Sequence, residues 1–147
     1  NWTGPTRCSF CDRDETIKHL FFDCPLAKVL WRTVHIAFNI TPPITVNALF
    51  GTWLNGIESA LARHIRVGVC ALLWTIWKCK NDLVFNITSR IHFLQVIFRA
   101  TAVIRSWSLL TPMKAREHLV TGSIRWEMVA RDIFIRFGWR SCNRIGN

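Results

Sequence analysis

The sequence predicts a mainly α-helical protein, with a small zinc-bound knuckle at the N-terminus followed by a bundle of about four to five helices. Three observations predict this fold. Cysteine and histidine residues gather in the first 24 positions at a spacing typical of metal ligands. From residue 25 onwards, apolar residues recur every three to four positions, which is the period of a helix. No run alternates strongly enough to predict a sheet beyond a small hairpin at the knuckle.

The knuckle is predicted from Cys8, Cys11, His19 and Cys24, which form a Cys-x2-Cys-x7-His-x4-Cys run. Three thiolates and one imidazole complete a tetrahedral shell without an open position for water, which is typical of structural zinc. Because proline is favoured at the first helical position, Pro25 indicates that Cys24 caps a helix whose dipole lowers the pKa of its thiol. The alternatives are three buried thiols with a surface histidine, or a disulfide. We predict one structural Zn2+.

The first two helical segments are delimited by helix breakers. Residues 25–39 place an apolar side chain at nearly every fourth position, and Thr-Pro-Pro at 41–43 ends this segment. Residues 46–54 form a short apolar segment that is predicted to make one or two helical turns. An Asn-Gly turn at 55–56 closes it.

The longest helical candidate covers residues 58–85. Its middle is apolar nearly all round, so we expect a central helix against which the others pack. Trp74 and Trp77 are therefore predicted to be core residues, and the Asn81-Asp82 pair is predicted to mark fraying or a break.

Two further segments complete the predicted bundle. Residues 89–110 form a long amphipathic helix that Thr111-Pro112 stops, and a short helix is expected from there to His118. Gly122 is expected to separate this helix from a last amphipathic segment, for which Gly138 is placed as the C-cap. The apolar residues of that last segment are Trp126, Val129, Ile133 and Phe137.

The predicted organisation has three parts. Residues 1–39 form the zinc module with its following helix, residues 40–138 form the helical region, and residues 139–147 form a loose tail. The other three cysteines are interpreted as core or incidental thiols, because free cysteine behaves as a small hydrophobe. They are Cys70, Cys79 and Cys142.

The chain of 147 residues has a formal net charge of +10. Residues 1–24 hold three Lys and Arg against four Asp and Glu, whereas the remainder holds sixteen against five. This excess favours nucleic acid, RNA or DNA, as the partner, with a merely solvated surface as the alternative. The longest strongly apolar run, residues 67–77, is shorter than the ~20 residues of a membrane span. With no secretion signal visible, we expect no membrane partner and an intracellular location, nucleus or cytoplasm.

Residues 2–31 resemble the zinc-binding domain of plant non-LTR (LINE-type) retrotransposon reverse transcriptases. The positions that carry the resemblance are Trp2, Gly4, Cys8-Ser9-Phe10-Cys11, Glu15-Thr16, the run His-Leu-Phe-Phe-Asp-Cys-Pro at 19–25, Ala27 and Trp31. The run Leu-Trp-Thr-Ile-Trp-Lys-Cys-Lys-Asn at 73–81, with Phe85, is similar to the segment that follows this domain in the same polyproteins. The resemblance implies a C-terminal fragment that starts inside the zinc domain.

The resemblance also implies a module that holds template RNA or target DNA for reverse transcription. Arg7, Phe10 and Arg13 lie in and beside the knuckle, where a ring and two cations could grip a single strand. The alternative for Phe10 is the small apolar core of the zinc module. Lys78 and Lys80 are further candidate nucleic-acid contacts, although Lys80 replaces the arginine common in the family and lacks its bidentate phosphate geometry.

No catalytic residues are predicted. Polymerase and nuclease sites need clustered carboxylates to hold paired metal ions. The acidic residues beyond the knuckle are scattered, at Glu58, Asp82, Glu117, Glu127 and Asp132. Neither a Gly-Lys-Ser/Thr phosphate loop nor a Gly-x-Ser-x-Gly elbow occurs. We expect no enzyme activity and no small-molecule substrate. The alternative functions are a helical protein-interaction module, docking for example on the reverse transcriptase body, and a relic without function.

Overall fold

Helices form the regular structure of the computed structural model, which describes residues 7–137. In chain order they are the π-helix η1 (His19–Asp23) and the α-helices α1 (Pro25–Phe38), α2 (Val46–Phe50), α3 (Ser59–Val84), α4 (Phe93–Ser108) and α5 (Met113–Phe137). The described residues contain no strand, and a single antiparallel bridge joins Arg7 to Asp14 in the knuckle. The predicted fold class is confirmed.

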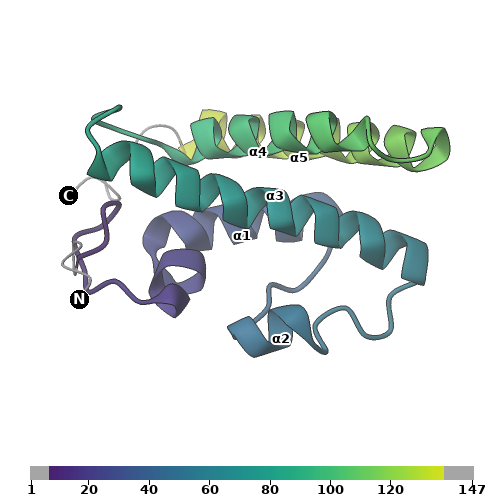
Figure 1. Ribbon diagram of the computed structural model, residues 1–147, viewed down its shortest axis with the longest axis horizontal. Coiled ribbons are helices and arrows are strands. Elements are labelled where there is room, and N and C mark those ends of the chain that lie inside the picture. The colour runs from purple at the N-terminus through teal and green to yellow at the C-terminus, as the bar shows by residue number, and fades with distance from the viewer. Residues whose placement is uncertain (1–6, 138–147) are drawn as a thin grey trace.

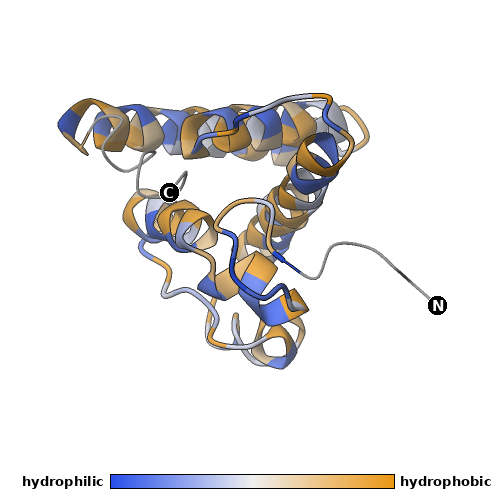
Figure 2. Cartoon of the chain, turned by 90° about the vertical axis from the view of Figure 1, so that its left-hand side faces the viewer, coloured by the Kyte–Doolittle hydropathy of each residue, from blue (hydrophilic) through white to orange (hydrophobic). Residues whose placement is uncertain are grey.

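The long helices pack side by side in a bundle (Figure 1). α4 contacts both α5 and α3, and α1 contacts α5 and η1. α3 crosses the middle of the molecule, whereas the short α2 lies apart along the lower edge in this view. Each long helix mixes hydrophobic and hydrophilic residues along its length (Figure 2), as expected for helices with one buried face.

One hydrophobic core connects the helices. Leu30 of α1, Leu72 of α3 and Ile97 of α4 are fully buried within it. From α5, Trp126 enters the same core and donates its Nε1–H to the Thr33 hydroxyl oxygen over 2.7 Å, so this buried indole is satisfied.

The same core also contains residues of the knuckle, including Cys8 and Phe10. The predicted division into residues 1–39 and 40–138 stays a prediction. The predicted tail at 139–147 lies outside the described residues, as do Trp2, Gly4, Gly138 and Cys142.

The predicted break at Gly122 is wrong, because α5 is one continuous helix from Met113 to Phe137. A glycine costs a helix interior about 1 kcal/mol relative to alanine. Here the neighbouring Leu119 and Ser123 are buried, which favours the helical path through the glycine. A Cβ at position 122 would lie 3.7 Å from Phe38 of α1, an ordinary van der Waals distance.

The predicted weak point at Asn81-Asp82 is also wrong, since α3 continues to Val84. Asp82 is buried and accepts a hydrogen bond from Arg99 of α4 over 2.8 Å. This ion pair fixes the C-terminal turn of α3. α4 begins later than predicted, at Phe93, because His92 forms a capping box with Gln95.

The prediction that Trp74 and Trp77 belong to the core is wrong. Their side chains are 49% and 43% exposed on the outer face of α3, and Cys70 on the same helix is exposed as well. Cys79, by contrast, is buried as predicted.

α3 is long and apolar enough to cross a membrane by length and composition, but a core helix of a soluble protein passes the same test.

Candidate metal centre

The first two cysteines are held by a tight reversal of the chain. The Cys8 amide donates to the Arg13 carbonyl over 2.7 Å, and the Asp12 amide donates back to the Cys8 carbonyl over 2.9 Å. Asp12 has a φ of 61°, in the left-handed region that a short reversal requires. The Arg7 guanidinium also donates to the Asp12 carbonyl. Backbone bonds thus bring the Cys8 and Cys11 side chains to one side of the loop.

The other two side chains come from η1 and from the start of α1. The Thr16 hydroxyl accepts the His19 amide over 2.9 Å and orients the first residue of η1. The Cys24 amide then donates to the His19 carbonyl over 2.8 Å, which closes the five-residue π turn. Cys24 is the N-cap of α1 and Pro25 follows at the first turn, as predicted.

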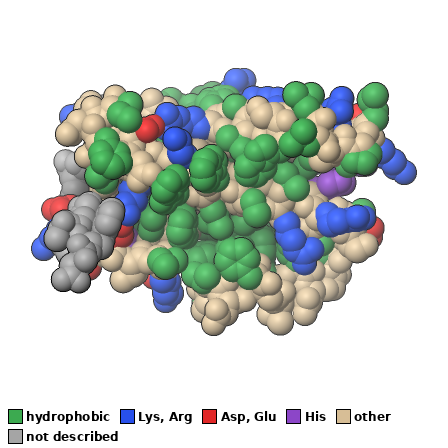
Figure 3. Space-filling view, viewed as in Figure 1, with side chains coloured by type: hydrophobic (Ala, Val, Ile, Leu, Met, Phe, Trp, Pro, Cys, Tyr) green, Lys and Arg blue, Asp and Glu red, His purple; other side chains and the backbone are tan. Residues whose placement is uncertain are grey.

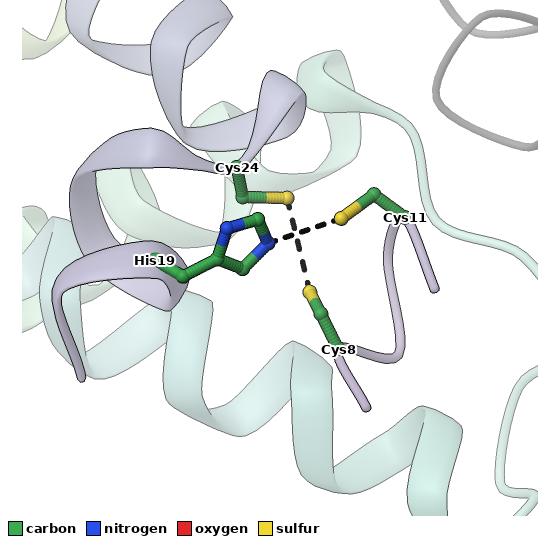
Figure 4. Close-up of side chains that lie close together, drawn as sticks. All are labelled: Cys8, Cys11, His19 and Cys24. Carbon is green, nitrogen blue, oxygen red and sulfur yellow. Dashed lines mark hydrogen bonds between the residues drawn. The ribbon is translucent and has the colours of Figure 1, made fainter. Parts of the chain in front are cut away.

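These elements bring the four side chains together (Figure 4). Their ligand atoms all lie within 4.8 Å of one another. The Cys8 and Cys24 sulfurs are 3.8 Å apart, and the Cys11 sulfur is 3.0 Å from His19 Nε2. Cys8 and Cys24 are 2% and 0% exposed, so the cluster is closed to water on that side.

The spacing fits a zinc ion better than a disulfide. All three cysteines are free, and a disulfide would need sulfurs at about 2.05 Å. Two sulfurs bound to a tetrahedral zinc at about 2.3 Å each are about 3.8 Å apart, the separation observed between Cys8 and Cys24. The contact between Cys11 and His19 is shorter than the ~3.5 Å expected across a zinc ion, and a small outward shift of either side chain would accommodate it.

The electrostatics of the cluster also fit a bound cation. Contact with the Cys24 thiol lowers the pKa of Cys8 to about 5, whereas the same contact, together with burial, raises the pKa of Cys24. Burial raises the pKa of Cys11 as well. Among themselves the thiols therefore favour one thiolate and share the remaining protons. A dication is what allows three neighbouring sulfurs to be thiolates together.

The prediction that the dipole of α1 lowers the pKa of the Cys24 thiol is wrong, because other contacts raise this pKa. The Leu26 amide at the start of α1 does lower the pKa of Cys24, but the Cys8 sulfur and burial outweigh it. The thiol with the lowered pKa is that of Cys8.

The helical fold and the closed Cys3His cluster define a small helical protein with a site for one structural zinc ion. Residues 1–31 match the model of a family described as zinc-binding in reverse transcriptase. No curated protein and no solved structure matches the chain. All four cluster residues lie within the matched segment, and this family is characterised by zinc binding rather than by catalysis.

Of the five predicted nucleic-acid contacts, three are exposed and two are not. Arg7 and Arg13 are exposed in the knuckle. Phe10, however, is only 7% exposed and packs in the core, so its ring is not available to stack on a base. Lys78 is exposed on α3. Lys80 is turned toward the knuckle, where its ammonium pairs with Glu15, and both side chains are largely buried.

Sequence reasoning missed two features near the site. The pairing of Glu15 with Lys80 has no signal in the sequence, because 65 positions separate the two residues and no periodic pattern relates them. The exposure of Trp74 and Trp77 was missed because the apolar neighbours on α3 mask which face is covered. A usable signal was present in the exposed cations on the same helix, Arg63, Arg66 and Lys78.

Proposed function

We propose that the chain is a non-catalytic, zinc-stabilised nucleic-acid-binding module derived from a plant non-LTR retrotransposon reverse transcriptase, and that it holds template RNA or target DNA inside the cell. The observation that carries the proposal is the coincidence of the family match with the cluster. The match covers residues 1–31, and all four candidate ligands fall within it and lie within 4.8 Å of one another. A closed shell stabilises the fold and leaves binding to the protein surface.

Zinc would be held by the sulfurs of Cys8, Cys11 and Cys24 and by Nε2 of His19. When bound, it supplies a fixed link between the knuckle loop, η1 and the first turn of α1. Because Cys24 caps α1, and α1 packs on α5 and α4, metal binding is expected to stabilise the helical bundle as well as the loop.

Charge supports a polyanionic partner. The chain carries a formal net charge of +10, and three deprotonated cysteines with one dication would lower it by only one unit. Several cations remain exposed on the described surface, among them Arg13, Arg63, Arg66 and Lys78. An excess of this kind attracts phosphate backbones without selecting a sequence.

A second candidate function is protein docking, for example on the reverse transcriptase body. The observation that favours it is the apolar surface: sixteen large hydrophobic side chains are exposed among the described residues, and Leu110 reaches 87%. Exposed apolar surface of this extent can mark a protein-interaction site.

The zinc centre is tested by measuring zinc per chain in purified, reduced protein. The wild type should contain about one zinc ion. Cys24→Ser should lose most of it, together with helical content, because this residue both ligates and caps α1. Cys70→Ser is the matched control, since Cys70 is exposed and outside the cluster, and should keep its zinc. A folded, reduced wild type without zinc would contradict the centre.

The two candidate functions are separated by the salt dependence of binding. For single-stranded nucleic acid, the logarithm of the affinity should fall with the logarithm of salt concentration at a slope of about −0.7 per neutralised phosphate. The fluorescence anisotropy of labelled RNA and DNA oligonucleotides, titrated at salt concentrations between about 50 and 200 mM, measures this slope. Zinc-loaded, folded protein without measurable affinity for either would refute nucleic-acid binding and favour docking on a protein.

A further inference from the structure

α3 carries an exposed aromatic pair on the side opposite its core face. The inner face contributes Ala71, Leu72 and Ile76 to the core. On the outer face, Trp74 and Trp77 are 49% and 43% exposed, with ring centroids 5.4 Å apart and planes inclined by 33°. Two indoles left in solvent at helical spacing offer flat apolar surfaces to a ligand.

The exposed residues of α3 combine this pair with positive charge alone. They are Ser59, Leu61, Arg63, Arg66, Cys70, Trp74, Trp77 and Lys78. Of the carboxylates nearest in sequence, Asp82 is buried against Arg99. Glu58 caps the helix by accepting backbone amides and interacts with Arg63 through its charge without forming an ion pair. Among the ion pairs found within residues 7–137, none involves Arg63, Arg66 or Lys78.

Helix geometry aligns the cations with the rings. Arg63 precedes Trp74 by eleven positions and Arg66 precedes Trp77 by the same interval, which is almost three full turns or about 16 Å. Each arginine therefore lies nearly in line with one indole along the helix. Lys78 follows at the other end of the pair. Figure 3 shows the result on this face of the molecule as a hydrophobic band along the middle with Lys and Arg beside it.

We propose that this surface, the tryptophan strip formed by Arg63, Arg66, Trp74, Trp77 and Lys78, binds single-stranded nucleic acid. Bases stack on the two indoles, and the three cations contact the phosphates on either side. This inference rests on the proposed function and adds to it the surface that performs the binding. Positively charged surfaces interleaved with aromatic side chains are how proteins bind single strands without reading their sequence.

A single strand fits the strip better than a duplex does. The indoles stand on one convex helix face, three residues apart, and need the flat face of an unpaired base. In a duplex those faces are covered by neighbouring base pairs, so the rings would gain nothing from it. The charge of the strip is complementary to phosphates, whereas a purely apolar protein partner would leave all three cations without a counter-charge.

The strip is anchored to the zinc end of the molecule. η1 contacts α3, and Lys80, two residues beyond Lys78, pairs with Glu15 of the knuckle segment. A strand bound on Trp74 and Trp77 would therefore pass close to the part of α3 that the knuckle supports. The zinc centre in this arrangement positions the helix and does not itself touch the strand.

The test compares the wild type with a double variant that carries both Trp74→Ala and Trp77→Ala. Anisotropy of short labelled single-stranded RNA and DNA oligonucleotides should show an affinity loss of about tenfold or more, since each stacked base contributes appreciably. The conservative double variant, Trp74→Phe with Trp77→Phe, should recover most of the affinity. Met128→Ala with Ile135→Ala is the matched control, because it removes two exposed apolar side chains, 64% and 79% exposed, from α5.

A charge variant tests the phosphate contacts separately. Lys78→Gln should reduce the salt slope for single strands by about 0.7, the value for one lost phosphate contact, whereas Lys114→Gln on α5 should leave it unchanged. Both lysines are exposed, so neither change should alter folding, which circular dichroism checks.

The outcomes separate the strip from the proposed function. Wild-type binding that survives both tryptophan double variants overturns the strip and leaves the module a nucleic-acid binder by another surface. A wild type that binds no strand at all overturns the proposed function and the strip with it. A wild type that self-associates, with an alanine double variant that does not and whose strand affinity is unchanged, would identify the strip as a docking face for a second copy of the chain and would overturn the proposal.

Discussion

The buried pair of Lys80 and Glu15 should be one of the strongest single links between the knuckle and the helical bundle. The two residues are 65 positions apart, and their side chains are only 17% and 12% exposed. The second carboxylate oxygen of Glu15 is buried without a hydrogen-bond partner. Replacing Lys80 with methionine therefore leaves a carboxylate that neither water nor a cation can solvate fully.

The expected cost follows from that burial. Removing one partner of a buried ion pair typically lowers the free energy of unfolding by about 3–5 kcal/mol, whereas an exposed pair contributes about 0–1 kcal/mol. Lys80→Met should therefore lower the free energy of unfolding by about 3–5 kcal/mol. Because small domains have a total stability of about 5–15 kcal/mol, this loss would be a large part of it.

A double-mutant cycle in urea makes the test specific. Zinc-loaded wild type, Lys80→Met, Glu15→Leu and the double variant are unfolded and compared. The double variant should be more stable than Lys80→Met, because the uncompensated charge is gone and two apolar groups of similar size replace the pair. A cost below about 1 kcal/mol for Lys80→Met would refute the reasoning, since it would mean that the pair is solvated like a surface salt bridge.

Three further outcomes are expected. Phe10→Ala should lower the free energy of unfolding in urea by about 3–5 kcal/mol and reduce the zinc affinity measured by chelator titration, because this core ring supports the knuckle. Arg7→Ala should do neither. Equal effects of the two substitutions would argue against a core role for Phe10. Asp82→Asn should cost about 1.5–3 kcal/mol by losing the charged acceptor for Arg99, against less than about 0.5 kcal/mol for Asp132→Asn in the exposed pair with Arg136. Burial, with His118 nearby, holds the pKa of His64 below its usual value. The unfolded chain therefore takes up that proton first, and stability is lost as the pH falls below about 6.5. Between about pH 7.5 and 5.5, the urea midpoint of His64→Gln should fall less than that of the wild type. Parallel profiles for the two proteins would contradict the burial of His64.

Much of the candidate site could be predicted from local chemistry. Ligand type and spacing in the first 24 residues predicted the four side chains that the structure gathers, and Pro25 predicted the cap at Cys24. The distribution of protons among the thiols could not be predicted, because it depends on the 3.8 Å contact between Cys8 and Cys24. The role of Phe10 cannot be predicted for a related reason, since one ring beside two arginines suits a core and a binding surface equally well.

The helix boundaries, too, could be predicted only in part from the local sequence. Breakers predicted the ends of α1 correctly to within one residue, but Gly122 did not break α5 and Asn81-Asp82 did not break α3. Propensity differences of about 1 kcal/mol are readily offset by tertiary contacts. The contact between Asp82 and Arg99 is of that kind, and it joins residues on different helices.

By itself, the sequence determined the helical class, the metal chemistry and the positive charge, because periodicity, ligand spacing and composition are properties of neighbouring residues. Only the tertiary structure decided which face of α3 is covered. A helical pattern states which residues share a face, but the packing of α4 and α5 determines which face loses its water. That choice buries Leu72 and Ile76, turns Lys80 to Glu15, and leaves Trp74 and Trp77 in solvent beside the cations.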